Sequence, residues 1–283
     1  MDLLEALRGG PPVFAAELRP PRAELAAAEG MDAWIDTYHA VRRLTRQGTF
    51  VFLTDNAVGA REEDNLRHLT TNLGHDVPRD RIVPFVTAKH SLEYCLSYAE
   101  RAHQHGFPAL VVLGGDKSVG TPRCVEHAWQ LRAMLRQRDH MIALGGWANP
   151  HADAERQVDF LRAPEFCAEF YLTQVVSHFD AGKVARFVDA AARQGVTLPG
   201  MFGVFFYRSA NARTLAALKD FIPVPAEGLT REFGGGDTAE DVCARTVRTL
   251  MDVGVKHFYI SNLPIARAQQ ALASILEKVG VTA

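Results

Sequence analysis

A chain of 283 residues, with 47% hydrophobic and 23% charged residues, has the size and composition of a globular protein with a well-buried core. Its 31 basic and 33 acidic residues nearly cancel, so no one-signed field favours nucleic acid or an anionic membrane as a partner. Cys95, Cys124, Cys167 and Cys243 lie far apart without a CxxC pair, which argues against a zinc site and a disulfide framework.

The amino-terminal segment has no features of a secretion signal. Asp2, Glu5 and Arg8 interrupt it, and no stretch of the chain approaches about 18 uninterrupted apolar residues, the length of a membrane span. We therefore expect a soluble, cytoplasmic protein.

Short runs rich in β-branched and aromatic residues recur along the chain. They are apolar almost throughout, which is typical of parallel strands buried on both faces. The predicted strands are residues 13–17, 50–54, 82–86, 109–113, 141–144, 170–174, 201–205 and 257–260.

Segments with helical spacing of apolar residues separate these runs. Alternating strands and helices indicate a parallel sheet, and eight such units of about 30 residues favour a closed barrel over an open sheet. We therefore predict an α/β protein, a single (β/α)8 TIM barrel over residues 1–283. Two helical stretches that illustrate the spacing are Trp34, Tyr38, Val41 and Leu44, and Leu92, Leu96, Ala99 and Ala102.

The connection between the last two predicted strands is unusually long. It has room for two helices, near residues 210–221 and 238–253, on either side of a loop at residues 223–236 rich in proline and glycine. One interpretation is a flexible connector, with Asp237 capping the next helix. The alternative is a lid over a substrate.

In this architecture the active site forms where the strands end, so polar residues there are the candidates for function. All of them are expected to face one mouth of the barrel. They are Glu17, Thr54-Asp55-Asn56, Gly114-Gly115-Asp116-Lys117, Thr173-Gln174 and Ser261-Asn262.

Two carboxylic acids stand out among these candidates. Glu17 ends an apolar strand, where desolvation would raise its pKa and let it donate a proton; alternatively, it pairs with Arg19 or Arg22. Asp116 follows two glycines that allow close approach of a ligand; alternatively, it caps a helix or pairs with Lys117.

An amide and a histidine complete the set. Gln174 carries donors and an acceptor suited to the polar edge of a heterocycle, or it makes a hydrogen bond within the core. His151 lies in the loop after the fifth strand, where it contacts a ligand or begins a helix.

The combination of these strand ends resembles the methylenetetrahydrofolate reductase family over nearly the whole chain. An acidic residue leads into paired prolines at the first strand, and Gly114-Gly115-Asp116 stands where the family has Arg-Gly-Asp. The remaining matches are Leu172-Thr173-Gln174, Phe179-Asp180, Phe187-Val188-Asp189, Gly195-Val196, Pro199, Gly203-Val204 and the segment from Gly254 to Tyr259.

The resemblance implies roles for the candidate residues. Glu17 would be the general acid that protonates folate as its five-membered ring opens, and Asp116 would tune the electrostatics of hydride transfer. Thr54 and Asp55, at the family's Thr-Tyr-Gly, would bind the substrate. Gln174 would bind the pterin or the nicotinamide. Cofactor contacts are also assigned to Gly115 and His151.

The chain departs from the family at the flavin site, so FAD binding is disfavoured. Gly114 replaces an arginine, Phe85 stands at or near a histidine, and no lysine occurs between Lys117 and Lys183, where the family has one. Charged hydrogen bonds are worth about 1.5–3 kcal/mol each, so losing several together weakens FAD binding greatly. A neighbour such as Arg123 could compensate for one loss.

The sequence therefore predicts reduction of 5,10-methylenetetrahydrofolate to 5-methyltetrahydrofolate by NADH or NADPH, with direct hydride transfer and without flavin. Two alternatives remain open. One is an FAD-dependent member of the same family, and the other is a catalytically silent barrel that binds folate.

Overall fold

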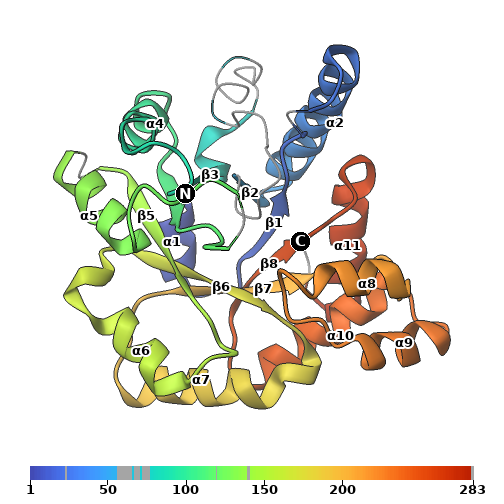
Figure 1. Cartoon of the computed structure of the whole chain (residues 1–283). Coiled ribbons are helices and arrows are strands. Elements are labelled where there is room, and N and C mark those ends of the chain that lie inside the picture. Colours follow the sequence, from blue (N-terminus) through green and yellow to red (C-terminus); the bar gives the residue numbers. More distant parts are fainter. Residues whose placement is uncertain are drawn as a thin grey trace.

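A computed structural model describes residues 1–22, 24–55, 66, 71, 77–118, 120–138 and 141–281. Within these residues, eight parallel strands follow one another in chain order and close into a barrel, since β8 pairs with β1 (Figure 1). The predicted (β/α)8 barrel is confirmed. The strands are β1 (Phe14–Leu18), β2 (Phe50–Leu53), β3 (Ile82–Thr87), β4 (Ala109–Leu113), β5 (Ala143–Ala148), β6 (Phe170–Val176), β7 (Gly200–Phe205) and β8 (His257–Ser261).

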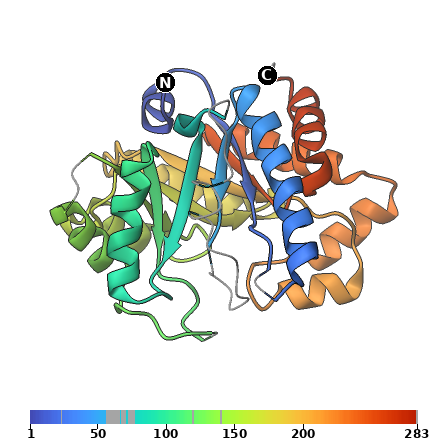
Figure 2. The same ribbon diagram turned by 90° about the horizontal axis from the view of Figure 1, so that it is seen from above.

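Helices surround the barrel, and short 3-10 turns, labelled η, lie between some of the elements (Figures 1 and 2). No helix in the described part of the chain is both long and apolar enough to cross a membrane. The helices are α1 (Leu3–Arg8), α2 (Ala27–Arg46), α4 (Leu92–Gln104), α5 (Ala128–Arg138), α6 (Ala154–Arg162), α7 (Ala181–Arg193), α8 (Ala212–Leu218), α9 (Ala226–Gly234), α10 (Ala239–Asp252) and α11 (Ala268–Val279), with η1 (Arg79–Arg81), η2 (Pro164–Phe166), η3 (His178–Asp180) and η4 (Ile265–Arg267).

The strands bury both of their faces. Their inner side chains fill the barrel, where Phe52 packs against Phe85 and Tyr259 at ring-centroid distances of 5.8 and 6.0 Å. Their outer side chains pack under the helices in a second, larger cluster. This explains why the strands read as continuous apolar runs.

Helix α1 closes the barrel at the end where the strands begin. An Asp2–Glu5 capping box starts the helix, and Leu3 and Leu7 pack into the inner cluster. Because this end is plugged, a ligand has to enter at the carboxyl ends of the strands.

The predicted strand boundaries lie within two residues of the observed ones except at β5. The predicted strand, residues 141–144, begins too early, since Met141 is 78% exposed and β5 starts at Ala143. It also ends too early, because Gly145 and Gly146 break the apolar pattern. A Cβ on Gly145 would lie 2.6 Å from Cζ of Phe170, so the ring from β6 requires a glycine there.

The long β7–β8 connection is more ordered than predicted. Helices α8 and α10 confirm the two predicted helices, but the expected loop at residues 223–236 contains a third helix, α9. The predicted cap at Asp237 is wrong, because Thr238 caps α10 in a capping box with Asp241.

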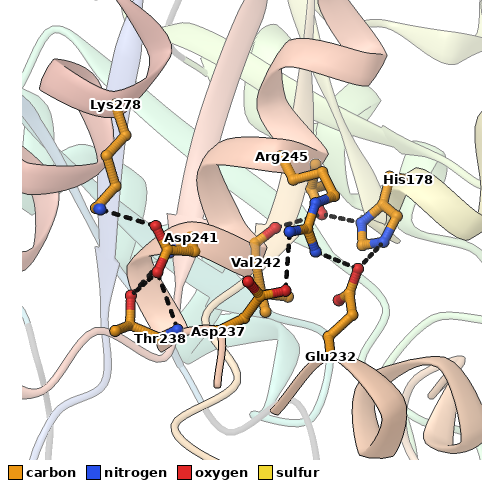
Figure 3. Close-up of polar contacts among 9 residues, drawn as sticks. His178, Glu232, Asp237, Thr238, Asp241, Val242, Arg245 and Lys278 are labelled. Carbon is orange, nitrogen blue, oxygen red and sulfur yellow. Dashed lines mark hydrogen bonds and ion pairs between the residues drawn. The ribbon is translucent and has the colours of Figure 1, made fainter. Parts of the chain in front are cut away.

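A polar cluster connects α9 with α10 and η3 (Figure 3). Glu232 of α9 accepts hydrogen bonds from Nε2 of His178, at 2.9 Å, and from Arg245 of α10. Nη2 of Arg245 also donates to Asp237 at 2.8 Å, and Nδ1 of His178 lies 2.9 Å from the hydroxyl of Thr246. The cluster joins α9 to α10 and to η3. The β7–β8 connection is thereby held to the rest of the protein around Glu232, near the carboxyl end of α9.

Candidate functional site

Glu17 faces the interior of the barrel near its open end. It pairs in register with Phe52 and follows Ala15 on the inner face of β1. Ser261, at the end of β8, donates a 2.5 Å hydrogen bond from its hydroxyl to Oε1 of Glu17. The serine is 8% exposed, whereas the glutamate is half-buried. One carboxyl oxygen is thereby held at a defined place beneath the mouth.

Two aromatic side chains near the same mouth were missed by the sequence analysis. Trp147 pairs in register with Leu172 of the inner cluster, yet it is 36% exposed. Phe205 pairs with Ser261 and lies beside a cavity of about 200 Å³ bounded by the ends of β7 and β8 and by α8. An exposed indole and a half-buried phenyl ring near the mouth suit the binding of a flat ring, although only Phe205 borders the cavity. The signal in the sequence was a tryptophan next to a glycine pair at a strand end.

Gln174 lies in a bulge of β6. The β6–β7 register shifts between Leu172 and Val175, and two hydrogen bonds hold the bulge. The Tyr259 hydroxyl donates to the Thr173 carbonyl at 2.5 Å, and the backbone N–H of Gly203 donates to the Thr173 hydroxyl at 3.1 Å.

The side-chain amide of Gln174 makes one of its possible hydrogen bonds within the described part of the protein. Its Oε1 accepts from the backbone N–H of Val175 at 2.9 Å, and no described residue hydrogen-bonds to its Nε2. A partly solvated amide donor beside a bulge can bind a ligand, since bulges often re-aim side chains at active sites.

Asp55 joins the ends of β2 and β3. It is 7% exposed, and its Oδ2 accepts from the backbone N–H of Thr87 at 2.7 Å and from Nε2 of His90 at 2.9 Å. Asp55 thus positions β3 and His90. Thr54, its half-buried neighbour, donates its backbone N–H to the Leu18 carbonyl. The third predicted residue, Asn56, lies outside the described residues.

Asp116 is half-buried at the end of β4, in an Asx turn. Its Oδ1 accepts from the backbone N–H and the hydroxyl of Ser118, at 2.7 and 2.6 Å. These hydrogen bonds lower its pKa, and the charges of Lys89 and Arg123 add to the effect. Asp116 is therefore an anion, and its observed partner is Ser118, while Lys117 is exposed.

Gly114 and Gly115 make room for two cations. A Cβ on Gly114 would lie 2.7 Å from Cζ of Arg123, and one on Gly115 would lie 2.8 Å from Cγ of Lys89. The guanidinium of Arg123 donates to the Gly115 carbonyl. Arg123 thus occupies the space beside Gly114, the position at which the reductase family has an arginine and this chain has a glycine.

His151 contacts other residues of the protein, at the end of β6 and in η3. Its Nε2 lies 2.9 Å from the Val175 carbonyl, its Nδ1 lies 3.6 Å from the Asp180 carboxylate, and it is 11% exposed. These contacts join His151 to the end of β6 and to η3, and the predicted contact with a cofactor stays a prediction. No group of three or more His, Cys, Asp or Glu side chains in the described part of the chain is arranged to hold a metal.

The fold is a TIM barrel, and the candidate site residues lie at the carboxyl ends of its strands. No family model matches the sequence, and neither does any curated protein. The resemblance to the reductase family therefore stays a prediction.

Solved structures share the fold. An uncharacterized protein from Clostridium thermocellum that binds two copies of 5-methyl-5,6,7,8-tetrahydrofolic acid is similar, with a TM-score of 0.69 at 14% identity over 98% of each chain. An F420-dependent secondary alcohol dehydrogenase, in complex with an F420–acetone adduct, gives 0.55 at 12% identity over 95% of this chain and 99% of its own. Apo-MsnO8 gives 0.63 at 10% identity, over 96% and 99%.

Proposed function

We propose that this protein binds a reduced folate in the mouth of the barrel and reduces 5,10-methylenetetrahydrofolate to 5-methyltetrahydrofolate with a reduced nicotinamide cofactor. The observation that carries the proposal is the carboxyl group of Glu17, held by Ser261 on the inner face of the mouth. The similar fold of a protein that binds 5-methyltetrahydrofolate supports the choice of ligand.

The reaction needs one proton and one hydride. As the N10–methylene bond breaks, the proton of Glu17 passes to N10, and the methylene carbon becomes an iminium on N5. Dihydronicotinamide, when bound, supplies the hydride that turns this carbon into a methyl group. The chain itself contributes the acid at Glu17, the Gln174 amide for the ring edge, and the aromatic faces of Trp147 and Phe205 that orient flat rings.

Binding and turnover can be tested separately. Titration with 5-methyltetrahydrofolate should quench the fluorescence of Trp147. The Trp147→Phe variant should lose most of that change, because the other two tryptophans lie outside the barrel interior: Trp34 is a buried residue of α2, and Trp129 lies on helix α5. Oxidation of NADH or NADPH in the presence of 5,10-methylenetetrahydrofolate, followed at 340 nm, tests turnover. A parallel arm with reduced F420 tests a deazaflavin as the hydride donor.

If the protein binds 5-methyltetrahydrofolate but oxidises none of these three donors, the catalytically silent folate-binding barrel is the better interpretation. Absence of folate binding would contradict the proposal altogether.

Gln174→Ala is expected to weaken folate binding and catalysis together, because its Nε2 donates to the ring system. Leaving the ligand without this partner costs about 1–3 kcal/mol, which corresponds to a loss of roughly 5- to 150-fold in affinity. Calorimetric titration with 5-methyltetrahydrofolate measures the loss. Unchanged affinity together with a lower melting temperature would instead assign Gln174 to the packing of β6.

The purified protein is expected to be colourless and to reduce 5,10-methylenetetrahydrofolate without added flavin. The reason is the loss of several flavin-site groups together, at Gly114, Phe85 and the lysine-free stretch between Lys117 and Lys183. An absorption spectrum of the purified protein and an assay with and without FAD check this. Yellow protein with stoichiometric FAD would leave the flavin-dependent alternative.

A further inference from the structure

Two of the four cysteines meet beside the end of β3. Cys95 lies near the start of α4 with no exposed surface, and its thiol donates to the Thr87 carbonyl at 3.4 Å. Cys124 is half-buried in the segment before α5, and its backbone N–H donates to the Ala88 carbonyl at 2.7 Å. The two cysteines, far apart in the chain, are therefore bound to consecutive residues at one strand end.

The side chains of these two cysteines also meet. Burial raises the pKa of the Cys95 thiol, and Cys124 raises it further through its charge and through a hydrogen bond between the two side chains. Both cysteines are free in the structure, and both pack against the outer core cluster. Because the two thiols are already neighbours, a disulfide between them can form with little movement of the backbone.

The pair joins two segments at the open end of the barrel. Thr87, which accepts the hydrogen bond from Cys95, is the last residue of β3. Arg123 precedes Cys124 in the chain, and its guanidinium donates to the Gly115 carbonyl just beyond β4. A covalent link between the cysteines would therefore tie α4 to a segment that contacts the end of β4.

We infer that Cys95 and Cys124 form a redox-modification site, at which a low-molecular-weight disulfide such as oxidised glutathione converts the two thiols into an intramolecular disulfide. The inference is independent of the proposed function. In the overall reaction the protein loses two hydrogens, and the oxidant is reduced to two molecules of thiol.

The conversion takes two exchange steps. The Cys124 thiolate attacks one sulfur of the oxidant, which forms a mixed disulfide and releases the first thiol. Cys95 then gives up its proton and attacks the Cys124 sulfur, which closes the protein disulfide and releases the second thiol. Cys124 reacts first because it is partly exposed, whereas Cys95 is shielded from the oxidant by burial.

The test incubates the native full chain with oxidised glutathione, blocks the remaining thiols and maps the products by mass spectrometry. We expect a peptide pair joined through Cys95 and Cys124, which dithiothreitol separates. Cys95→Ala lacks the second thiol and should retain glutathione on Cys124. Cys124→Ser should leave Cys95 unmodified. Cys167→Ser removes another half-buried cysteine and is the matched control, which should form the link as the wild type does.

The link is also expected to raise the melting temperature of the wild type by several degrees, because a cross-link restricts the unfolded chain. Dithiothreitol should reverse this rise, and Cys124→Ser should show none. A melting temperature that does not rise on oxidation would contradict the tie between α4 and the segment before α5.

The mapping decides the inference without any measurement of activity. Wild-type protein that stays reduced, or that keeps glutathione on Cys124, would overturn it. A link from Cys124 to Cys167 or Cys243 would overturn it as well. Circular dichroism shows whether each variant is folded. If Cys95→Ala fails to fold, the wild type and Cys124→Ser still give the answer.

Discussion

Replacing Glu17 with glutamine is expected to lower kcat for folate reduction by about 10²- to 10⁴-fold, the usual contribution of a general acid. Glutamine has nearly the same shape, and its carbonyl can still accept the hydrogen bond from Ser261, so the packing of the mouth should persist. What the variant lacks is the proton that opens the five-membered ring. The measurement is steady-state oxidation of the nicotinamide at 340 nm.

Two further measurements make this result interpretable. The affinity for 5-methyltetrahydrofolate should change by less than about tenfold, since the product no longer needs the acid. Glu277→Gln, on the exposed face of α11, is the matched control and should keep full activity. A Glu17→Gln enzyme that keeps most of its turnover would show that Glu17 is a structural carboxylate.

Gly203→Ala is expected to lower the free energy of unfolding by about 1–3 kcal/mol, the usual range for overpacking a core. The new Cβ would lie 2.5 Å from Cζ of Tyr259, a ring that is buried within the barrel and has no room to turn away. Moving this ring also breaks its hydrogen bond to the Thr173 carbonyl, which holds the bulge that carries Gln174. Urea denaturation measures the stability, and folate titration measures the effect on the site.

Gly182→Ala is the control for this substitution. Gly182 lies in α7 with its nearest contact 3.8 Å away, so an alanine fits there and should raise stability, by about 0.5–1 kcal/mol. If Gly203→Ala were as stable as the wild type, the barrel interior near β7 would be looser than the structure shows. Reduced stability with unchanged folate affinity would separate the bulge from ligand binding.

The sequence alone determined the barrel and the strand ends that form its mouth. Strands buried on both faces must be apolar throughout, and the helices between them must be amphipathic. Both patterns can therefore be recognised in short stretches of the sequence. From the sequence, Glu17 and Ser261 could be placed only at the same end of the barrel, because both lie near the carboxyl ends of predicted strands. That they touch is shown only by the folded structure.

Local sequence failed where distant side chains decide the conformation. Gly145 and Gly146 look like a strand break, but they belong to β5 because aromatic rings from β6 and η2 fill the space of the missing side chains. Helix α9 looks like a loop because proline and glycine flank it, and its anchor, Glu232, finds His178 and Arg245 only in the folded protein.

For the candidate site, too, some features could be predicted from the sequence and others only from the folded structure. Residue types and strand ends sufficed to select Glu17, Asp116 and Gln174, because each is a polar group at the end of an apolar run. Which groups they meet was decided by tertiary structure: the bulge that orients Gln174 is held by Tyr259, 85 residues further along the chain. Lys89 and Arg123 come from two separate loops, and only the closed barrel brings their side chains over Gly114 and Gly115.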